Sequence, residues 1–150
     1  MSIPAAQRAG ITLRLRRKFS KPPAKVFEAW TRPEALRRWW CPPGWEPGDI
    51  TVDVRAGGSY RIGMRRVSDG KQVSIEGQFV KVVPAQELVY TWRWVGVFEQ
   101  MPETRVTVEF LPVDAGTELV LTHENFPDVP LWQQHRGGWI AACDRMEQTL

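Results

Sequence analysis

Cysteine is scarce in this chain of 150 residues, which contains Cys41 and Cys143 and no others. The two thiols lie far apart and belong to no CxxC or Cys/His pattern, so neither a disulfide framework nor a zinc site is expected. No apolar run approaches the roughly 18 residues of a membrane-spanning helix, and residues 1–10 contain no apolar segment of signal-peptide type. These absences predict a cytoplasmic protein that is not inserted into a membrane.

Motifs of known catalytic chemistry are missing as well. The sequence has no HExxH, P-loop or GxGxxG pattern, and no Ser, Cys or Asp stands in a recognisable nucleophile motif. Its two histidines, His123 and His135, are the side chains whose ordinary pKa lies near neutrality. No metal and no cofactor are therefore expected, and an enzymatic role would depend on these two residues.

Charge of one sign does not dominate, since 20 Lys and Arg stand against 17 Asp and Glu for a net charge of +3. The basic residues form short clusters that alternate with apolar ones, as Arg14 and Arg16 alternate with Leu13 and Leu15. Such alternation is typical of the solvated face of a strand. Nucleic-acid binding would need a continuous basic stripe with outward aromatic residues, so nucleic acid is not an expected partner.

Tryptophan is present in excess, with eight copies in a chain of otherwise ordinary globular composition. The length predicts one domain, residues 1–150, with residues 1–9 as a flexible N-terminus. Aromatic rings fill space with few rotatable bonds, so many of them in one interior either pack solid or enclose a stiff cavity. The surplus makes a pocket the leading functional question.

The first third of the chain predicts a strand and two short helices. Residues 10–18 alternate apolar and polar side chains, which indicates a half-buried strand, and Pro22-Pro23 can open a helix. The capping-box pattern from Thr31 to Glu34 predicts a second helix, capped by Thr31, that runs to Trp39.

The middle of the chain predicts an antiparallel meander. A Pro- and Gly-rich loop over residues 42–47 carries Trp45 in an exposed position, and Val54 is expected to point inward from the strand that follows. Short turn-rich links between consecutive strands imply antiparallel neighbours. The expected strands are residues 49–55, 59–66, 72–83, 87–95, 104–111 and 117–123.

The last 20 residues change to a period of 3.6, which predicts one long helix. Its apolar stripe consists of Trp132, His135, Trp139, Ala142 or Cys143, Met146 and Leu150. A sheet with one apolar face must be covered, so this helix is expected to lie across it. The predicted fold class is α+β: a curved antiparallel sheet of six to seven strands wrapped around a long C-terminal helix, with two short helices after the first strand.

Large inward-facing side chains of this fold are the candidate ligand-binding residues. Core packing alone explains each of them singly, because a buried large apolar side chain contributes about 1.5–3 kcal/mol. As a set they predict a cavity for a small hydrophobic or aromatic ligand, with Trp39, Trp40 and Trp45 at its mouth. The remaining candidates are Tyr60, Ile62, Met64, Phe79, Tyr90, Trp92, Trp94, Val108, Leu119, Leu121, His123, Trp132, His135 and Trp139.

Several short motifs along the chain resemble one family. They are Ala29 to Trp40 (AWTRPEALRRWW), Gly57-Gly58-Ser59-Tyr60-Arg61, Gly77-Gln78-Phe79, Leu88 to Trp92, Gly116 to Leu119, Thr122-His123-Glu124 and Gly138-Trp139. In this order they resemble the homologues of the activator of heat-shock protein ninety ATPase, a branch of the START-like (SRPBCC) helix-grip superfamily, and the chain resembles a bacterial single-domain member. The resemblance implies a cavity between the curved sheet and the long helix.

The resemblance implies a fold more strongly than an activity, because such folds host carriers, receptors, cyclases and chaperone cofactors alike. A first alternative is therefore a protein-interaction module that binds a chaperone or a second copy through Arg61, Arg65 and Arg93 on the outer sheet face. A second is a cyclase-like or hydrolytic enzyme that uses His123 or His135, although structural histidines are the commoner case.

Overall fold

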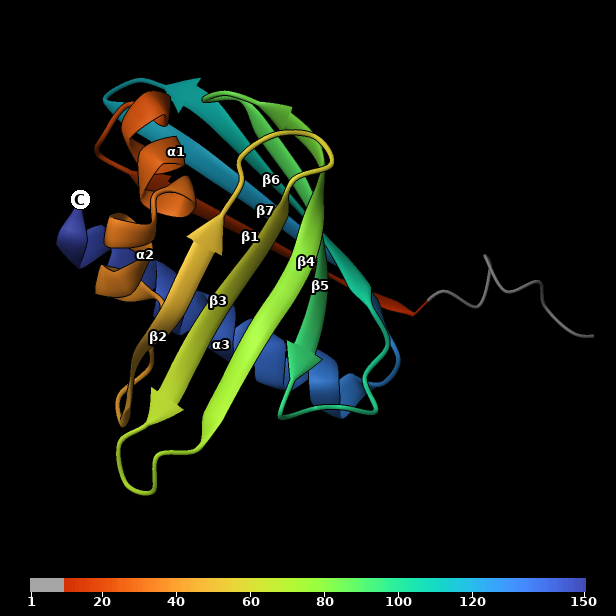
Figure 1. Cartoon of the computed structure of the whole chain (residues 1–150). Helices are drawn as coiled ribbons and strands as arrows, with labels where there is room; N and C mark the ends of the chain where they lie inside the picture. Colours follow the sequence, from red (N-terminus) through yellow and green to blue (C-terminus); the bar gives the residue numbers. More distant parts are fainter. Residues whose placement is uncertain (1–9) are drawn as a thin grey trace, which may run out of the picture.

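The computed structural model describes residues 10–150, so the predicted flexible segment 1–9 lies outside the described residues. Seven antiparallel strands form one curved sheet in the order β1-β7-β6-β5-β4-β3-β2, and α3 lies against its concave side (Figure 1). The elements are β1 (Ile11–Phe19), α1 (Pro23–Thr31), α2 (Pro33–Trp39), β2 (Trp45–Val52), β3 (Ser59–Arg66), β4 (Gln72–Val83), β5 (Glu87–Val95), β6 (Thr104–Val113), β7 (Gly116–Phe126) and α3 (Val129–Thr149).

The predicted fold class is confirmed. Strands β2 to β7 follow one another as a meander, whereas β1 pairs with β7, so the first two strands of the chain occupy opposite edges of the sheet. The segment that contains α1 and α2 connects these two edges. Both short helices therefore lie at one end of the sheet, close to the C-terminal end of α3 (Figure 1).

The capping box predicted before α2 is wrong. Thr31 is the last residue of α1, and its hydroxyl donates to the backbone oxygen of Phe27 at 2.8 Å. Arg32 is the N-cap of α2 and makes no side-chain capping bond. The reason is Pro33, which disfavours the helical conformation for the residue before it and so shifts the break between the helices by one position.

Strand β2 differs most from its predicted range. It begins at Trp45 instead of residue 49, and Val54 lies beyond its end and is exposed, contrary to the prediction. The register with β3 shifts between Pro47 and Ile50. An edge strand tolerates a proline and such a bulge because one side of its backbone has no strand to pair with, so a Pro-rich segment could still form a strand. Strands β6 and β7 also extend past their predicted ends, to Val113 and Phe126.

The apolar stripe of the final helix is confirmed. His135, Trp139, Ala142, Cys143 and Met146 are buried on α3, while Trp132 and Leu150 at its ends are half-buried. The helix begins with an N-cap, because the side chain of Asp128 accepts a hydrogen bond from the backbone amide of Leu131 at 2.9 Å.

Replacing Asp128 tests this N-cap directly. We expect Asp128→Ala to lower the free energy of unfolding by about 1 kcal/mol, because the Leu131 amide loses its acceptor. Asp128→Asn retains the acceptor oxygen and should leave stability within a few tenths of a kcal/mol of wild type. Urea denaturation of the three proteins measures both differences, and equal losses in the two variants would contradict the capping role.

Candidate functional site

A cavity of about 430 Å³ lies between α3 and the ends of β3, β4 and β5. This volume is within the roughly 300–1,000 Å³ of small-molecule sites. Six aromatic side chains line it, from the segment after α2, from β2, from β5, from the β5–β6 loop and from α3: Trp40, Trp45, Trp92, Trp94, Phe98 and Trp139. The rings come from segments distant in the sequence, so the folded sheet and α3 together create the cavity.

The remaining lining is mostly small or aliphatic, with three polar side chains. The apolar members are Pro42, Met64, Val73, Val97, Gly138, Ala141 and Ala142, and the polar ones are Gln134, His135 and Arg145. Gln134 and Gly138 are exposed to solvent on α3. A molecule can therefore reach the cavity from the side of this helix.

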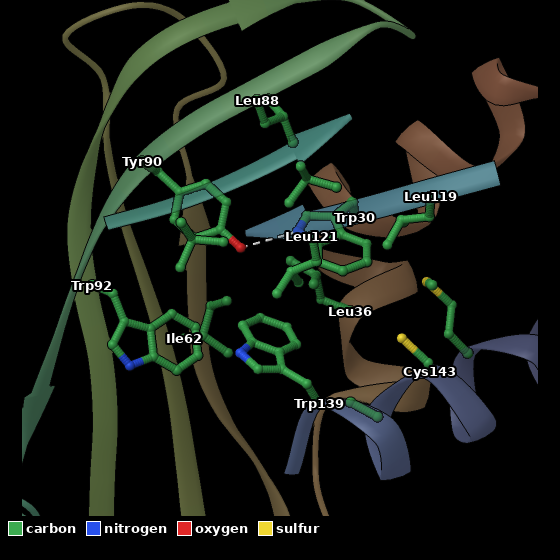
Figure 2. Packing of buried hydrophobic residues seen from close by; sticks show 14 of the residues in the cluster. Trp30, Leu36, Ile62, Leu88, Tyr90, Trp92, Leu119, Leu121, Trp139 and Cys143 are labelled. Atoms are coloured by element: carbon green, nitrogen blue, oxygen red, sulfur yellow. Dashed lines mark hydrogen bonds between the residues drawn. The ribbon is translucent and has the colours of Figure 1, made fainter. Parts of the chain in front are cut away.

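Under the middle of the sheet the interior is packed. Trp139 of α3 stacks on Trp30 of α1 at 5.9 Å between ring centroids and meets Trp92 of β5 at 5.1 Å. Figure 2 shows Trp92 and Trp139 facing one another, with Tyr90 hydrogen-bonded to Trp30 beside them. A void of about 20 Å³ in this region has room for about one water molecule. Space for a ligand lies toward the end of β5, around Trp94, and not at the centre.

The structure divides the predicted ligand-binding residues into three groups. Those that line the large cavity are Trp40, Trp45, Met64, Trp92, Trp94, His135 and Trp139. Those around the small void alone are Tyr60, Ile62, Phe79 and Tyr90. The others line neither space and lie in the packed core or, for the half-buried Trp132, against β1: Trp39, Val108, Leu119, Leu121, His123 and Trp132.

Sequence reasoning missed several residues of the cavity. Gln134, Gly138, Ala141 and Arg145 repeat at helical spacing and form a second stripe beside the apolar one on α3. The two small residues on that stripe, Gly138 and Ala141, were the signal in the sequence that could have indicated a space beside the helix. Phe98 belongs to the β5–β6 loop, where no periodicity indicates which way a side chain points.

Both histidines have their ring nitrogens occupied. His123 is fully buried; its Nδ1 accepts the indole N–H of Trp139 at 3.1 Å, so its proton resides on Nε2, which donates to the hydroxyl of Thr104 at 2.8 Å. His135 has the opposite tautomer: Nε2 accepts from the indole of Trp94 at 2.9 Å and Nδ1 donates to the backbone oxygen of Leu131 at 2.8 Å.

These bonds and the burial keep both imidazoles neutral. Desolvation places the pKa of His123 well below its ordinary value of 6.5, with a smaller contribution from nearby His135. Desolvation also lowers the pKa of His135, partly offset by its bond to the Leu131 carbonyl. Neither ring has a free lone pair for a general base.

The fully buried polar atoms of the large aromatic residues have partners, with one exception. The hydroxyl of Tyr90 accepts from Trp30 Nε1 at 3.2 Å, and the hydroxyl of Tyr60 donates to the Thr91 carbonyl at 2.5 Å. Trp92 is 4% exposed, and its Nε1 has no hydrogen-bond partner within the described chain. Buried indole N–H groups usually have one, so this donor is exceptional.

Arg145 connects α3 to the end of α2. Its Nε donates to the backbone oxygen of Trp39 at 2.8 Å, and its Nη2 donates to that of Trp40 at 3.1 Å. These carbonyls form the C-terminal end of α2, where the helix dipole favours a cation. Desolvation lowers the pKa of Arg145, but an arginine remains charged at neutral pH. Within residues 10–150 it forms no salt bridge.

The two thiols are poor nucleophiles at neutral pH. Cys41 is half-buried and Cys143 is buried, and desolvation raises the pKa of each to about 11. Among residues 10–150 no group of three or more His, Cys, Asp or Glu side chains could hold a metal ion. In that same part of the chain no helix has both the length and the apolar character needed to cross a membrane.

A curved antiparallel sheet around a long helix, with a cavity between them, defines the START-like helix-grip class. Residues 20–150 match the family described as "Activator of Hsp90 ATPase homolog 1-like protein". The match covers most of the chain, so the protein belongs to this family, as the motif resemblance indicated. Ligand binding and cochaperone-like roles are both known for this fold.

Solved structures of bacterial proteins agree with this assignment. A protein from Chromobacterium violaceum is 27% identical with a TM-score of 0.81, over 94% of this chain and 98% of that chain. One from Rhizobium leguminosarum is 27% identical with a TM-score of 0.79, over 92% of each chain. The AHSA1 protein from Silicibacter pomeroyi, 24% identical with a TM-score of 0.80 over 93% of this chain and 96% of that chain, supports the fold alone. No curated protein matches the sequence.

The neutral histidines predict a specific pH dependence of stability. Because the folded-state pKa of both rings lies below 6.5, the unfolded chain binds more protons than the folded chain as the pH falls through 6.5. The free energy of unfolding should therefore decrease between pH 7 and pH 5, by up to about 1.4 kcal/mol per pH unit for each histidine.

Urea denaturation across this pH range measures the slope. His135→Gln removes one of the two titrating groups and should reduce the slope by about half, with His123 providing the rest. A wild-type stability that stays constant between pH 7 and pH 5, or a slope unchanged by His135→Gln, would contradict the neutral assignment.

Proposed function

We propose that this protein binds a small, largely apolar or aromatic molecule in the cavity between α3 and strands β3 to β5. The observation that carries the proposal is the cavity itself: about 430 Å³ lined by six aromatic rings. Rings held by the sheet and by α3 lose little conformational entropy when a planar molecule enters, so a rigid aromatic site favours binding.

Two glycines in the middle of α3 support this use of the space. Gly137 and Gly138 each lower the stability of the helix by about 1 kcal/mol relative to alanine, because they stand in its interior. A Cβ atom built at either position meets nothing within 4 Å, so packing within the described chain does not require glycine. At Gly138, which lines the cavity, the missing side chain leaves room for something other than the protein.

The β5–β6 loop provides further support. Phe98 has a positive φ of 51°, which an ordinary residue adopts at a cost of about 1 kcal/mol or more. Its ring contacts Trp94 at 5.3 Å and His135 at 5.6 Å between centroids, and these contacts hold the loop against the cavity. Strained backbone of this kind is frequent where a loop forms part of a ligand site.

The two alternatives have less support. On the outer sheet face, Arg61 and Arg93 are both in register with Glu76, and Arg65 pairs with Glu46, so the positive charges are interleaved with acidic ones. No observation on that face favours a chaperone or a second copy. An enzyme that used His123 or His135 would need a free ring nitrogen, and all four accept or donate a hydrogen bond within the protein.

Neighbouring glycines on α3 provide a matched test. Gly138→Leu projects a side chain at the cavity, whereas Gly137→Leu adds the same group at an exposed position outside it. Both changes should keep or raise stability by up to about 1 kcal/mol, because glycine is a poor helix residue. We expect aromatic compounds that raise the melting temperature of the wild type and of Gly137→Leu to have little effect on Gly138→Leu.

Tryptophan fluorescence gives an independent readout, because five of the eight tryptophans line the cavity. A bound aromatic molecule should change the emission of the wild type and of Gly137→Leu. Equal binding by Gly138→Leu, or no binding to any of the three proteins across a broad panel of apolar compounds, would refute the proposed function.

A further inference from the structure

Two hydrogen-bond donors of this cavity, the fully buried Trp92 Nε1 and the guanidinium of Arg145, lack a full set of protein partners and indicate the chemistry of its occupant. Resting on the proposed function, we propose that the ligand is an organic anion: an aromatic or other apolar molecule that carries a carboxylate.

Trp92 supplies a donor that the protein leaves unused. Its ring is 4% exposed and contacts the rings of Trp40, Trp94 and Trp139 at centroid distances of 5.8, 5.8 and 5.1 Å. The ring of His123 lies at 5.1 Å, but both of its nitrogens are already bonded. In Figure 2 the indole nitrogen of Trp92 lies on the edge of the ring away from Tyr90. Trp92 lines the cavity, and an oxygen atom of a ligand that reached this buried donor would satisfy it.

Arg145 supplies the charge. An arginine has five N–H groups, and the two bonds to the Trp39 and Trp40 carbonyls use Nε and one N–H of Nη2. The two N–H groups of Nη1 have no acceptor within residues 10–150. The end of α2 holds the guanidinium in place, so an entering carboxylate meets a half-buried cation that is already oriented.

The other polar groups of the lining favour the same sign of charge. No Asp or Glu is among the described residues that line the cavity. His135 has no free nitrogen, so the amide of Gln134 is the remaining side-chain acceptor. Aromatic rings alone could also surround a cationic ligand, but the positive charge of Arg145 opposes one in this cavity.

Three probes of one shape test the inference: naphthalene-2-carboxylate, the neutral naphthalene-2-carboxamide and the cationic 2-naphthylmethylamine. Calorimetry or tryptophan quenching at pH 7.5 gives a Kd for each. We expect the carboxylate to bind about tenfold tighter than the carboxamide, and the amine to bind weakest. This factor corresponds to one charge-assisted hydrogen bond.

Two variants assign the effect to residues. Arg145→Gln should raise the Kd of the carboxylate about tenfold and leave that of the carboxamide near its wild-type value, which also shows that the cavity is intact. Trp92→Phe keeps an aromatic ring without the N–H and should weaken the carboxylate and the carboxamide alike. Should Arg145→Gln fail to fold, the ranking of the three probes on the wild type decides the question.

The outcomes separate this inference from the proposed function. Equal affinity for carboxylate and carboxamide, tightest binding of the amine, or a carboxylate preference that persists in Arg145→Gln would overturn the anion inference and leave the binding function standing. Failure of all three probes to bind the wild type at millimolar concentration, with no effect of Gly138→Leu on any other apolar compound, would overturn both.

Discussion

The contact of Trp139 with Trp30 and Trp92 is the interaction on which the rest of this structure depends. It joins α3, α1 and β5, three segments far apart in the sequence, at centroid distances of 5.9 and 5.1 Å. Burial of such rings dominates core energetics, and their stiffness fixes the separation of helix and sheet. The indole of Trp139 also donates to His123, so the position of α3 along the sheet is set by a polar bond as well as by packing.

Placing α3 in this way produces a packed region and an open one. The helix packs against α2, β1 and β7, whereas Met64 of β3 and Val73 of β4 face it across the cavity. A sheet that twists and curls cannot stay in contact with a straight helix along its whole width. Aromatic side chains fill the gap near Trp30 and leave it open near Trp94, where small residues of α3 face it. Around that space the ring nitrogens of His135 are saturated, whereas Trp92 Nε1 and the guanidinium of Arg145 retain N–H groups without protein acceptors.

Much of the fold was predictable because local periodicity reports burial. Strands β3, β4 and β5 have the predicted bounds, and the stripe from His135 to Met146 is the buried face of α3. The errors lie where a local sequence pattern was overridden by an adjacent residue or by a partner strand. Pro33 displaced the capping box of Thr31, and edge-strand pairing with β3 extended β2 back to Trp45 through a proline-rich segment. Turn and capping patterns describe isolated segments, so they fail where a proline or a partner strand overrides them.

For the site, the sequence by itself determined that a surplus of large aromatic side chains would face the interior and that neither histidine belongs to a catalytic motif. It did not determine which rings would interlock and which would line a space. Tyr90 and Trp94 lie on one strand with the same inward alternation, yet Tyr90 is bonded to Trp30 in the packed core and Trp94 lines the cavity. Only the tertiary structure decided this, because the space between two surfaces depends on how far they lie apart. Periodicity gives the direction of a side chain but not that distance.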